Sequence, residues 1–186
     1  MKKLIIVSLA LAAATTMYAQ GTVKFATTGG RASYATVAEG SSLAVGSFLG
    51  ADMIGAVMFE GKEIGREFFV EKSGVPSGRL GGSTLAVDGL AAGGTFTFTL
   101  EAFNAAYEAV SDKSQLYAGG KDAIYYGVST PFSYTTGNPS DPLALPASAM
   151  NVANFGVDAY SVVPEPTTIA LGILGLSSLL LFRRRD

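Results

Sequence analysis

The sequence predicts an all-β fold, an antiparallel β-sandwich of jelly-roll-like arrangement with one short helix. Apolar and polar residues alternate in several short runs, as they do in strands with one buried face. Turn-forming pairs separate these runs, and the chain has 23 glycines among its 186 residues. Glycine readily adopts the backbone conformations that tight turns need. The turn pairs are Gly29-Gly30, Gly81-Gly82, Asp88-Gly89, Gly93-Gly94, Gly119-Gly120 and Asn138-Pro139.

The clearest strand covers residues 95–103 and follows Gly93-Gly94. Its even-numbered residues are apolar and its odd-numbered ones are mostly threonine, so we expect the even-numbered face to be buried. In a second strand, residues 21–27, Val23 and Phe25 are expected to point inward. The other strands are expected at residues 55–60 and 67–71, joined across 61–65, and at residues 84–87, 124–128 and 152–159.

A short helix and a long loop complete the predicted domain. Residues 104–110 (NAAYEAV) predict one or two helical turns, because alanine and glutamate favour helix. Residues 135–150 contain three prolines and predict an extended surface loop. Residues 20–162 are numerous enough to bury a core without disulfides, so we expect a single domain there.

The composition excludes several kinds of chemistry. The chain has no cysteine, histidine or tryptophan, so thiolate catalysis, disulfides and the usual neutral-pH general base are absent. The net charge is -2, with five basic residues at the two ends. The absence of a basic patch argues against nucleic-acid binding. We therefore expect no cofactor and no enzymatic activity.

The N-terminal residues 1–19 have the layout of a secretory signal peptide. Lys2 and Lys3 precede a short apolar stretch, and small residues follow up to Ala19. We expect cleavage between Ala19 and Gln20. Because Met17 departs from the usual small residue, a cut one or more residues away fits too. An uncleaved anchor is the alternative, disfavoured because the apolar run is short.

The C-terminal region has an apolar run at residues 167–182 with no charge. As a helix these 16 residues would span about 24 Å, and a short span of this kind is tolerated by thinning of the bilayer. A buried core helix is disfavoured, because the run is apolar on every face and lies against the terminus. Arg183, Arg184 and Arg185 then stop the span and stay on the cytoplasmic side. Both ends thus predict a domain outside the inner membrane.

A proline-flanked strip lies just before this run. Val163 is followed by Pro164, Glu165 and Pro166. Proline restricts its own backbone and favours extended geometry in the residue before it. We therefore expect an exposed, extended strip at the membrane surface, the geometry that a protease or transpeptidase needs in order to bind its substrate.

Residues 163–186 resemble the PEP-CTERM sorting signal of Gram-negative bacteria. The resemblance rests on the motif at residues 163–166, the short span at 167–182 and the basic tail at 183–186, in that order. It implies an exosortase-like membrane protease or transpeptidase as a partner, which cuts at or near the motif. It further implies that residues 163–166 are recognition residues. The family often accompanies secreted polysaccharide.

A looser resemblance covers part of the predicted domain. Residues 93–107, a strand that runs into a short helix, and the start at residues 20–25 are similar to a recurrent sandwich domain in Verrucomicrobia-type PEP-CTERM proteins. This resemblance implies an all-β fold and no particular chemistry.

Four glutamates are a candidate catalytic cluster. A pair of carboxylates acts as acid and base in glycoside hydrolysis. We favour a hairpin with solvated charges, because basic residues are interleaved and nothing indicates a cleft. The glutamates are Glu60, Glu63, Glu67 and Glu71. No calcium-loop motif occurs, although distant loops that together hold calcium stay open as an alternative.

An aromatic-rich stretch is a candidate sugar-binding surface. Exposed aromatic rings bind sugars in carbohydrate-binding sandwiches, but core packing is the more common use of such residues, and we favour it. The residues are Tyr117, Tyr125, Tyr126, Phe132 and Tyr134.

The sequence thus predicts a non-enzymatic, exported protein of the cell envelope or extracellular matrix, sorted through its tail. It is first anchored in the inner membrane and then processed. The alternatives are a carbohydrate-binding module for secreted polysaccharide and, least favoured, a hydrolase using the glutamates.

Overall fold

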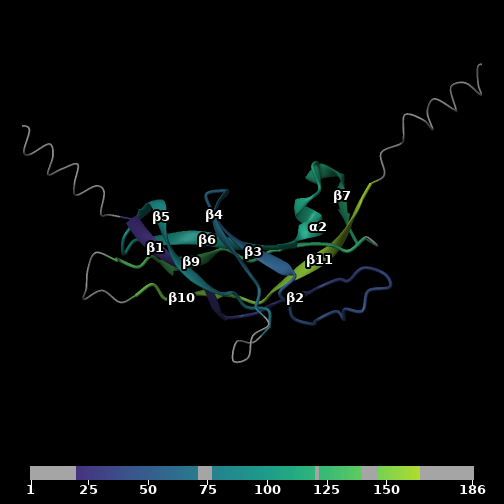
Figure 1. Cartoon of the computed structure of the whole chain (residues 1–186), viewed down its shortest axis with the longest axis horizontal. Coiled ribbons are helices and arrows are strands. Elements are labelled where there is room, and N and C mark those ends of the chain that lie inside the picture. The colour runs from purple at the N-terminus through teal and green to yellow at the C-terminus, as the bar shows by residue number, and fades with distance from the viewer. Residues whose placement is uncertain (1–19, 71–76, 120–121, 140–145, 164–186) are drawn as a thin grey trace, which may run out of the picture.

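The computed structural model describes residues 20–70, 77–119, 122–139 and 146–163, and these form mainly β-structure (Figure 1). Two curled sheets carry a short helix, α2 (Ala105–Glu108), and a 3-10 turn, η1 (Lys113–Gln115). The strands are β1 (Gln20–Gly29), β2 (Ala32–Tyr34), β3 (Met53–Phe59), β4 (Lys62–Phe68), β5 (Gly81–Ala91), β6 (Thr95–Asn104), β7 (Leu116–Ala118), β8 (Ile124–Val128), β9 (Phe132–Thr135), β10 (Ala149–Val152) and β11 (Phe155–Val162). The prediction of an all-β fold with one short helix is confirmed for the described residues.

The strands form a smaller and a larger sheet. The smaller has the order β10-β1-β5, and the larger has the order β2-β11-β8-β6-β3-β4, with β7 on β11 and β9 on β6. Most neighbours are antiparallel, as predicted. Two pairs, β1 with β10 and β2 with β11, are parallel, so the expectation of a wholly antiparallel sandwich is wrong. Strands far apart in sequence form both parallel pairs, which long crossovers permit and tight hairpins do not.

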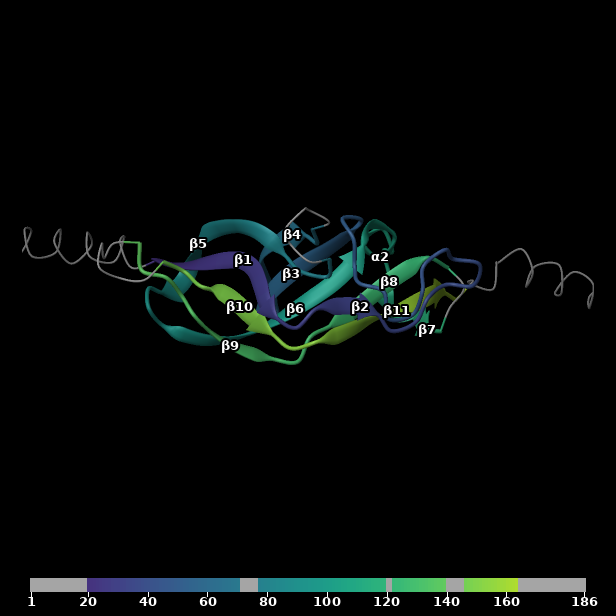
Figure 2. The same ribbon diagram turned by 90° about the horizontal axis from the view of Figure 1, so that it is seen from below.

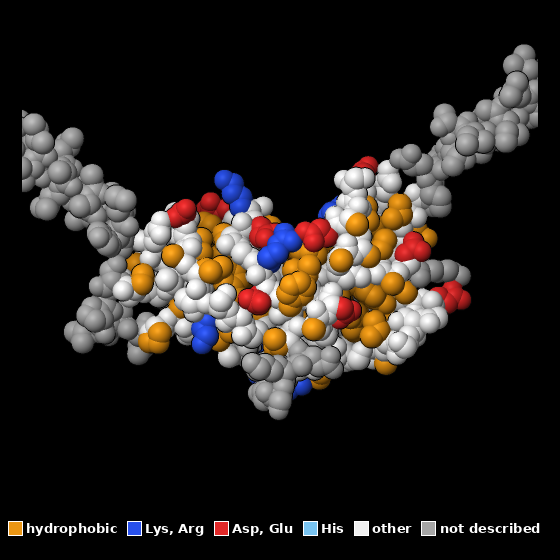
Figure 3. Space-filling model, in the orientation of Figure 1, with side chains coloured by type: hydrophobic (Ala, Val, Ile, Leu, Met, Phe, Trp, Pro, Cys, Tyr) orange, Lys and Arg blue, Asp and Glu red, His pale blue; other side chains and the backbone are white. Residues whose placement is uncertain are grey.

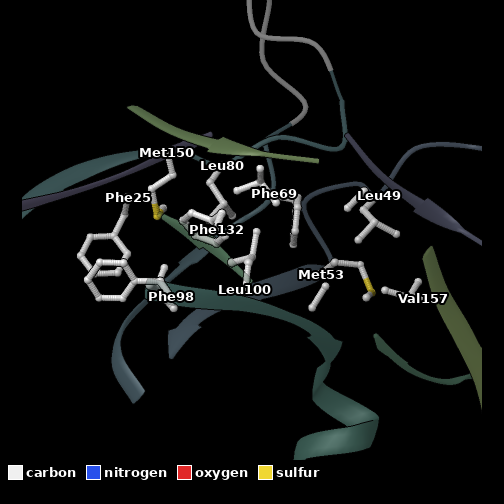
Figure 4. Packing of buried hydrophobic residues seen from close by; sticks show 14 of the residues in the cluster. Phe25, Leu49, Met53, Phe69, Leu80, Phe98, Leu100, Phe132, Met150 and Val157 are labelled. Carbon is white, nitrogen blue, oxygen red and sulfur yellow. The ribbon is translucent and has the colours of Figure 1, made fainter. Parts of the chain in front are cut away.

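The main core lies between the sheets (Figure 4). Val23 and Phe25 of β1 are fully buried, and Phe98 and Leu100 of β6 are almost so. The predicted inward faces of these two strands are therefore confirmed. Figure 4 shows Phe98 beside Phe25 at one end of the core, with Leu100 nearer its middle.

A second, smaller cluster lies on the outer face of the larger sheet. Ile54 and Ala56 of β3 and Phe103 of β6 are buried there, and Tyr107 and Tyr126 pack against them. Phe103 belongs to the face of β6 that the alternation assigned to solvent. It is buried because α2 folds back over this part of the sheet, which the period of a single strand does not reveal.

The β3–β4 hairpin differs from the prediction. The expected link at residues 61–65 is mostly strand, because β4 already begins at Lys62. The chain instead turns at Glu60 and Gly61, which both have positive φ angles, of 50° and 75°. Two-residue turns of this kind match the twist of paired strands. The turn was missed because glutamate rarely occupies its first position.

Replacing Glu60 with asparagine is expected to raise the free energy of unfolding by about 0.5–1 kcal/mol, since asparagine tolerates the left-handed backbone better than glutamate. Urea-induced unfolding measures the change. Glu60→Val is the matched comparison and should destabilise the hairpin. Equal unfolding midpoints for the three proteins would contradict the turn described above.

Other boundaries differ where glycine is used for bulges. The pairs Gly81-Gly82 and Asp88-Gly89 lie inside β5 and not between strands. Gln20 pairs with Ala91, whereas the next residue of β1 pairs with Val87, so the residues around Gly89 form a bulge. Residues 152–159 divide between β10 and β11, and β2, β7 and β9 were not predicted. Strands β2, β7 and β9 are short, and each pairs with a strand that is distant in the sequence.

The helix and the last predicted turn before β6 agree with expectation. Asn104 caps α2, with its side chain accepting a hydrogen bond from the Tyr107 N–H at 3.1 Å. The Gly93-Gly94 turn joins β5 to β6. The predicted surface loop at residues 135–150 is wrong at both ends, because Thr136 is buried, Gly137 forms a β-bridge with Thr22 of β1, and β10 already begins at Ala149.

The described chain begins and ends at opposite ends of the molecule (Figures 1 and 2). Gln20 starts β1 beside β5, and β11 ends beside β7. The predicted signal peptide (1–19) and the tail from Pro164 onward, including its span and arginines, lie outside the described residues. In the part that is described, no helix has the length and apolar character that crossing a membrane requires.

Candidate functional site

A groove of about 350 Å³ crosses the outer face of the larger sheet. It combines an aromatic floor with charged side chains. Its lining residues are Met58, Glu63, Arg66, Glu101, Phe103, Tyr107, Glu108, Lys113 and Tyr126.

The register of three strands builds the apolar row that underlies the groove. Ile54 of β3 lies opposite Phe103 of β6, which in turn lies opposite Tyr126 of β8. Residues opposed in this way share one face of a sheet, so the three side chains form a row. A register shift in β4 pairs Glu63 with Met58 and Arg66 with Ala56. Because of this shift, Glu63 and Arg66 lie on the same outer face, although they are three residues apart in the sequence.

Asn104 fixes α2 over this floor. Besides capping the helix, its side chain accepts from the Tyr125 N–H at 3.1 Å and donates to the Ala123 carbonyl at 2.6 Å. These bonds tie the start of α2 to β8. Tyr107 therefore stacks on Tyr126, with ring centroids 4.4 Å apart and planes 8° from parallel.

Arg66 joins two glutamates at the groove edge. Its guanidinium donates to both carboxylate oxygens of Glu63 at 2.7 Å and to Glu108 at 2.6 Å. These hydrogen bonds raise the pKa of Arg66, with Glu63 as the largest cause and Glu108 second. Figure 3 shows basic side chains flanked by acidic ones near the middle of the view, beside exposed hydrophobic side chains. Because the pairs are exposed, we expect them to add about 1 kcal/mol or less to stability.

Two basic side chains of the same chain already lie against aromatic rings of the groove. The Lys113 ammonium lies 4.7 Å from the Tyr107 ring centre, and the Arg66 guanidinium lies 5.8 Å from that of Phe103. Lys113 also donates to the carbonyl of Val110 at 3.1 Å. A ligand that stacked on the Lys113 side of Tyr107 would have to displace this ammonium.

Burial and charge perturb the groove tyrosines. Burial, followed by the negative charge of Glu101, raises the pKa of Tyr126 and of Tyr107. In the core, burial raises the pKa of Tyr34 to about 12. Each hydroxyl is thus held protonated well beyond neutral pH.

The domain is expected to lose stability as the pH rises above about 10. The perturbed tyrosines have higher pKa values when folded, so they lose protons first in the unfolded chain. The unfolded chain then binds fewer protons, and the free energy of unfolding falls with increasing pH. Urea midpoints at about pH 9 and about pH 11 measure the effect. Tyr126→Phe should reduce the dependence of the urea midpoint on pH. A wild-type urea midpoint that is the same at both pH values would contradict the raised tyrosine pKa values.

The structure brings only part of the glutamate cluster together: Glu60 and Glu63 line one pocket beside Lys62 and Asp88. Glu63 faces outward with Arg66, whereas Glu67 lies opposite Gly55 and beside Gly82, on the other face of β4. Glu60 occupies the hairpin turn, and Glu71 lies outside the described residues. Glu63 and Glu67 are therefore not arranged as an acid–base pair across one substrate. Within the described ranges, no three carboxylates gather in a way that would hold a metal ion.

The aromatic stretch separates into core and surface residues. Tyr125, Phe132 and Tyr134 are buried, in agreement with the preferred interpretation. The Tyr125 hydroxyl accepts a hydrogen bond from the Ala38 N–H at 3.2 Å, so Tyr125 is no sugar platform. Tyr117 is 48% exposed on β7, and Tyr126 alone of the five lines the groove.

Sequence reasoning missed most of the groove. Its aromatic partners Phe103 and Tyr107 come from β6 and α2, and neither was singled out. One signal was present: Phe103 interrupts the polar face of its strand, which indicates that something covers that face.

Of the proposed sorting and cleavage residues, two are described. Gln20 is exposed at the start of β1, where its side chain donates to Asp88. Val163 is 47% exposed at the end of β11. Ala19, Pro164, Glu165, Pro166 and Arg183, Arg184 and Arg185 lie outside the described residues.

Comparison with protein-family models, with curated proteins and with solved structures gave no match to this chain.

Proposed function

We propose that this chain is a non-enzymatic, exported protein of the cell envelope or extracellular matrix, sorted through its C-terminal signal. The observation that carries the proposal is the sequence of the tail. Pro164-Glu165-Pro166 is followed by a charge-free run at 167–182 and then by three arginines. The N-terminal layout of residues 1–19 predicts the same topology. The domain between them is a jelly-roll-like sandwich in this proposal.

The groove chemistry supports a non-enzymatic role. Its tyrosines are held protonated, and Arg66 is already bound to two carboxylates. Glu63 and Glu67 lie on opposite faces of β4.

In the proposed sorting step, the partner is an exosortase-like protease or transpeptidase of the inner membrane. The peptide C–N bond near residues 163–166 breaks, and its nitrogen leaves as an amine that takes up a proton. The carbonyl carbon bonds to the oxygen of water or to the nucleophilic atom of an acceptor. The domain is then released or attached to another molecule of the envelope.

The test is the intact mass of the mature protein from membrane and secreted fractions of the native host. We expect loss of residues 1–19 and of the residues beyond the motif, and any excess mass would identify an attached group. As a control, Arg183, Arg184 and Arg185 together replaced by serine should leave the tail unprocessed. A wild-type mass that retains residues 183–186 would mean a stable membrane anchor and would overturn the sorting proposal.

Carbohydrate binding is a second candidate function, favoured by the groove in which Tyr107 and Tyr126 lie beside a charged edge. Aromatic rings stack on the apolar faces of sugars, while carboxylates and guanidinium groups bond to hydroxyls. The groove has three acidic and two basic residues, which suits a neutral or amino sugar better than an acidic one.

Calorimetric titration with purified exopolysaccharide of the native host tests this function. Tyr107→Ala and Tyr126→Ala should each abolish binding, whereas Lys113→Ala should strengthen it by uncovering a ring face. Phe48→Ala, at an exposed ring outside the groove, is the matched control. No binding by the wild-type protein, or equal binding by all four variants, would reject the groove as a sugar site.

A further inference from the structure

The last residues of the described domain are held by a narrow strap, which we define as η1 and β7 (residues 113–118). β7 pairs antiparallel with the end of β11: Ala118 lies opposite Tyr160, Tyr117 opposite Ser161 and Leu116 opposite Val162. The strap therefore covers the backbone edge of the chain just before the proposed sorting motif.

Hydrogen bonds extend this pairing to the last described residue. The Val163 N–H donates to the Gln115 carbonyl at 2.9 Å, and the Gly119 N–H donates to the Ala159 carbonyl at 2.9 Å. Hydrogen-bonded pairs recur every second residue in an antiparallel ladder. Tyr117 and Ser161, midway between these two bonds, thus occupy a hydrogen-bonded position.

Beyond the ladder with β11, the strap is attached at η1. There Lys113 donates to the carbonyls of Tyr107 at 3.3 Å and Val110 at 3.1 Å, and its ammonium lies 4.7 Å from the Tyr107 ring centre. Asp112 caps η1, accepting from the Ser114 N–H at 3.0 Å and from its hydroxyl at 2.7 Å. β11 is the one strand that β7 pairs with among the described residues, and Tyr117 and Ala118 are exposed. Short, exposed elements open at low free-energy cost, so the β7 part of the strap is suited to leave β11 while η1 stays attached and the sandwich stays folded.

The strap lies close to the proposed cut. Val163 is still within the sheet's hydrogen bonding, and Pro164 to Pro166 are the only residues between it and the apolar run. Three extended residues reach about 10 Å. An enzyme that binds an extended substrate forms main-chain bonds to residues on both sides of the cut. On the N-terminal side, those positions are already used by the strap.

We propose that the strap must leave β11 before the processing enzyme can bind the chain around Val163, so that strap opening sets the rate of tail processing. This inference rests on the proposed function and adds a regulatory step to it. Where a protease acts on a transiently opened state, cleavage follows the population of that state. Contacts that close or loosen the strap would therefore control how fast the domain leaves the membrane.

A reversible lock tests the proposal in the full chain. The chain has no cysteine, so Leu116→Cys together with Val162→Cys introduces its single disulfide. These residues are opposed at a non-hydrogen-bonded position, where Cα atoms lie about 4.5 Å apart and a disulfide fits. In membranes of the native host, the oxidised protein should resist processing, and dithiothreitol should restore the wild-type rate.

A second pair of variants loosens the strap. Tyr117→Pro removes a ladder N–H and should speed processing by about tenfold. Tyr117→Thr keeps the N–H and is the matched control, with an unchanged rate. Hydrogen exchange at the Val163 amide should be faster in Tyr117→Pro than in Tyr117→Thr, which establishes that the strap opened.

The outcomes separate the two proposals. If the wild-type tail is never processed, the sorting proposal fails, and the strap proposal falls with it. If the wild-type tail is processed and the oxidised lock is processed equally fast, sorting stands and the strap proposal is overturned. A Tyr117→Pro variant with faster exchange at Val163 and an unchanged processing rate would overturn it as well.

Discussion

Replacing Phe98 with alanine is expected to lower the free energy of unfolding by about 3–5 kcal/mol. Phe98 is 1% exposed in the main core. Its ring lies 5.5 Å from that of Phe59, 5.9 Å from that of Tyr134 and 6.4 Å from that of Phe132. These rings come from two other strands, β3 and β9, so they cannot all move inward to fill the space. The loss is a large share of the stability of an ordinary domain.

Urea-induced unfolding followed by circular dichroism measures this change, because the chain has no tryptophan to report it. Phe68→Ala is the control, since Phe68 is 56% exposed on β4. Its effect should be about 1 kcal/mol or less. If both variants lost the same free energy of unfolding, Phe98 would not be the closely packed core residue described above.

Replacing Gly127 with alanine is expected to destabilise the domain by about 3 kcal/mol. A Cβ atom at this position would lie 2.2 Å from the Gly156 carbonyl oxygen and 2.8 Å from the Val157 Cα. Both obstacles are backbone atoms of β11, so no side-chain rotation relieves them. β8 and β11 would have to move apart, and their pairing would weaken.

The same unfolding experiment tests Gly127, with Val128→Ala as control. Val128 follows in the same strand and is 43% exposed, so its truncation should cost about 0.5 kcal/mol. An unchanged unfolding midpoint for Gly127→Ala would mean that the two strands are less closely packed than described.

The inward residues of β1 and β6 and the capped helix after β6 could be predicted from the sequence. In these segments the signal is local: alternation over ten residues, a glycine pair before the strand, and Asn104 before two alanines. The Glu60-Gly61 turn, the bulge around Gly89 and the parallel pairs could not be predicted. Each depends on a partner strand that pairs at a particular register, and a register is a property of two segments.

The candidate site was harder to predict than the fold. Glu63 and Glu67 are close in sequence but lie on opposite faces of β4 because a register shift intervenes. The groove instead collects Arg66, Phe103, Tyr107 and Tyr126 from four elements. No spacing in the sequence predicts that these four residues lie together, because sheet register and the position of α2, fixed by Asn104, bring them close.

By itself, the sequence determined the strand-rich class of this protein, the buried faces of its two clearest strands and the chemistry it lacks. Those properties follow from composition and from a two-residue period, which act within single segments. Only the tertiary structure decided which faces meet, that Phe103 is covered, and that the strap of η1 and β7 holds the chain as far as Val163. These depend on contacts between segments far apart in the chain, whose energies come from packing and pairing and not from local preference.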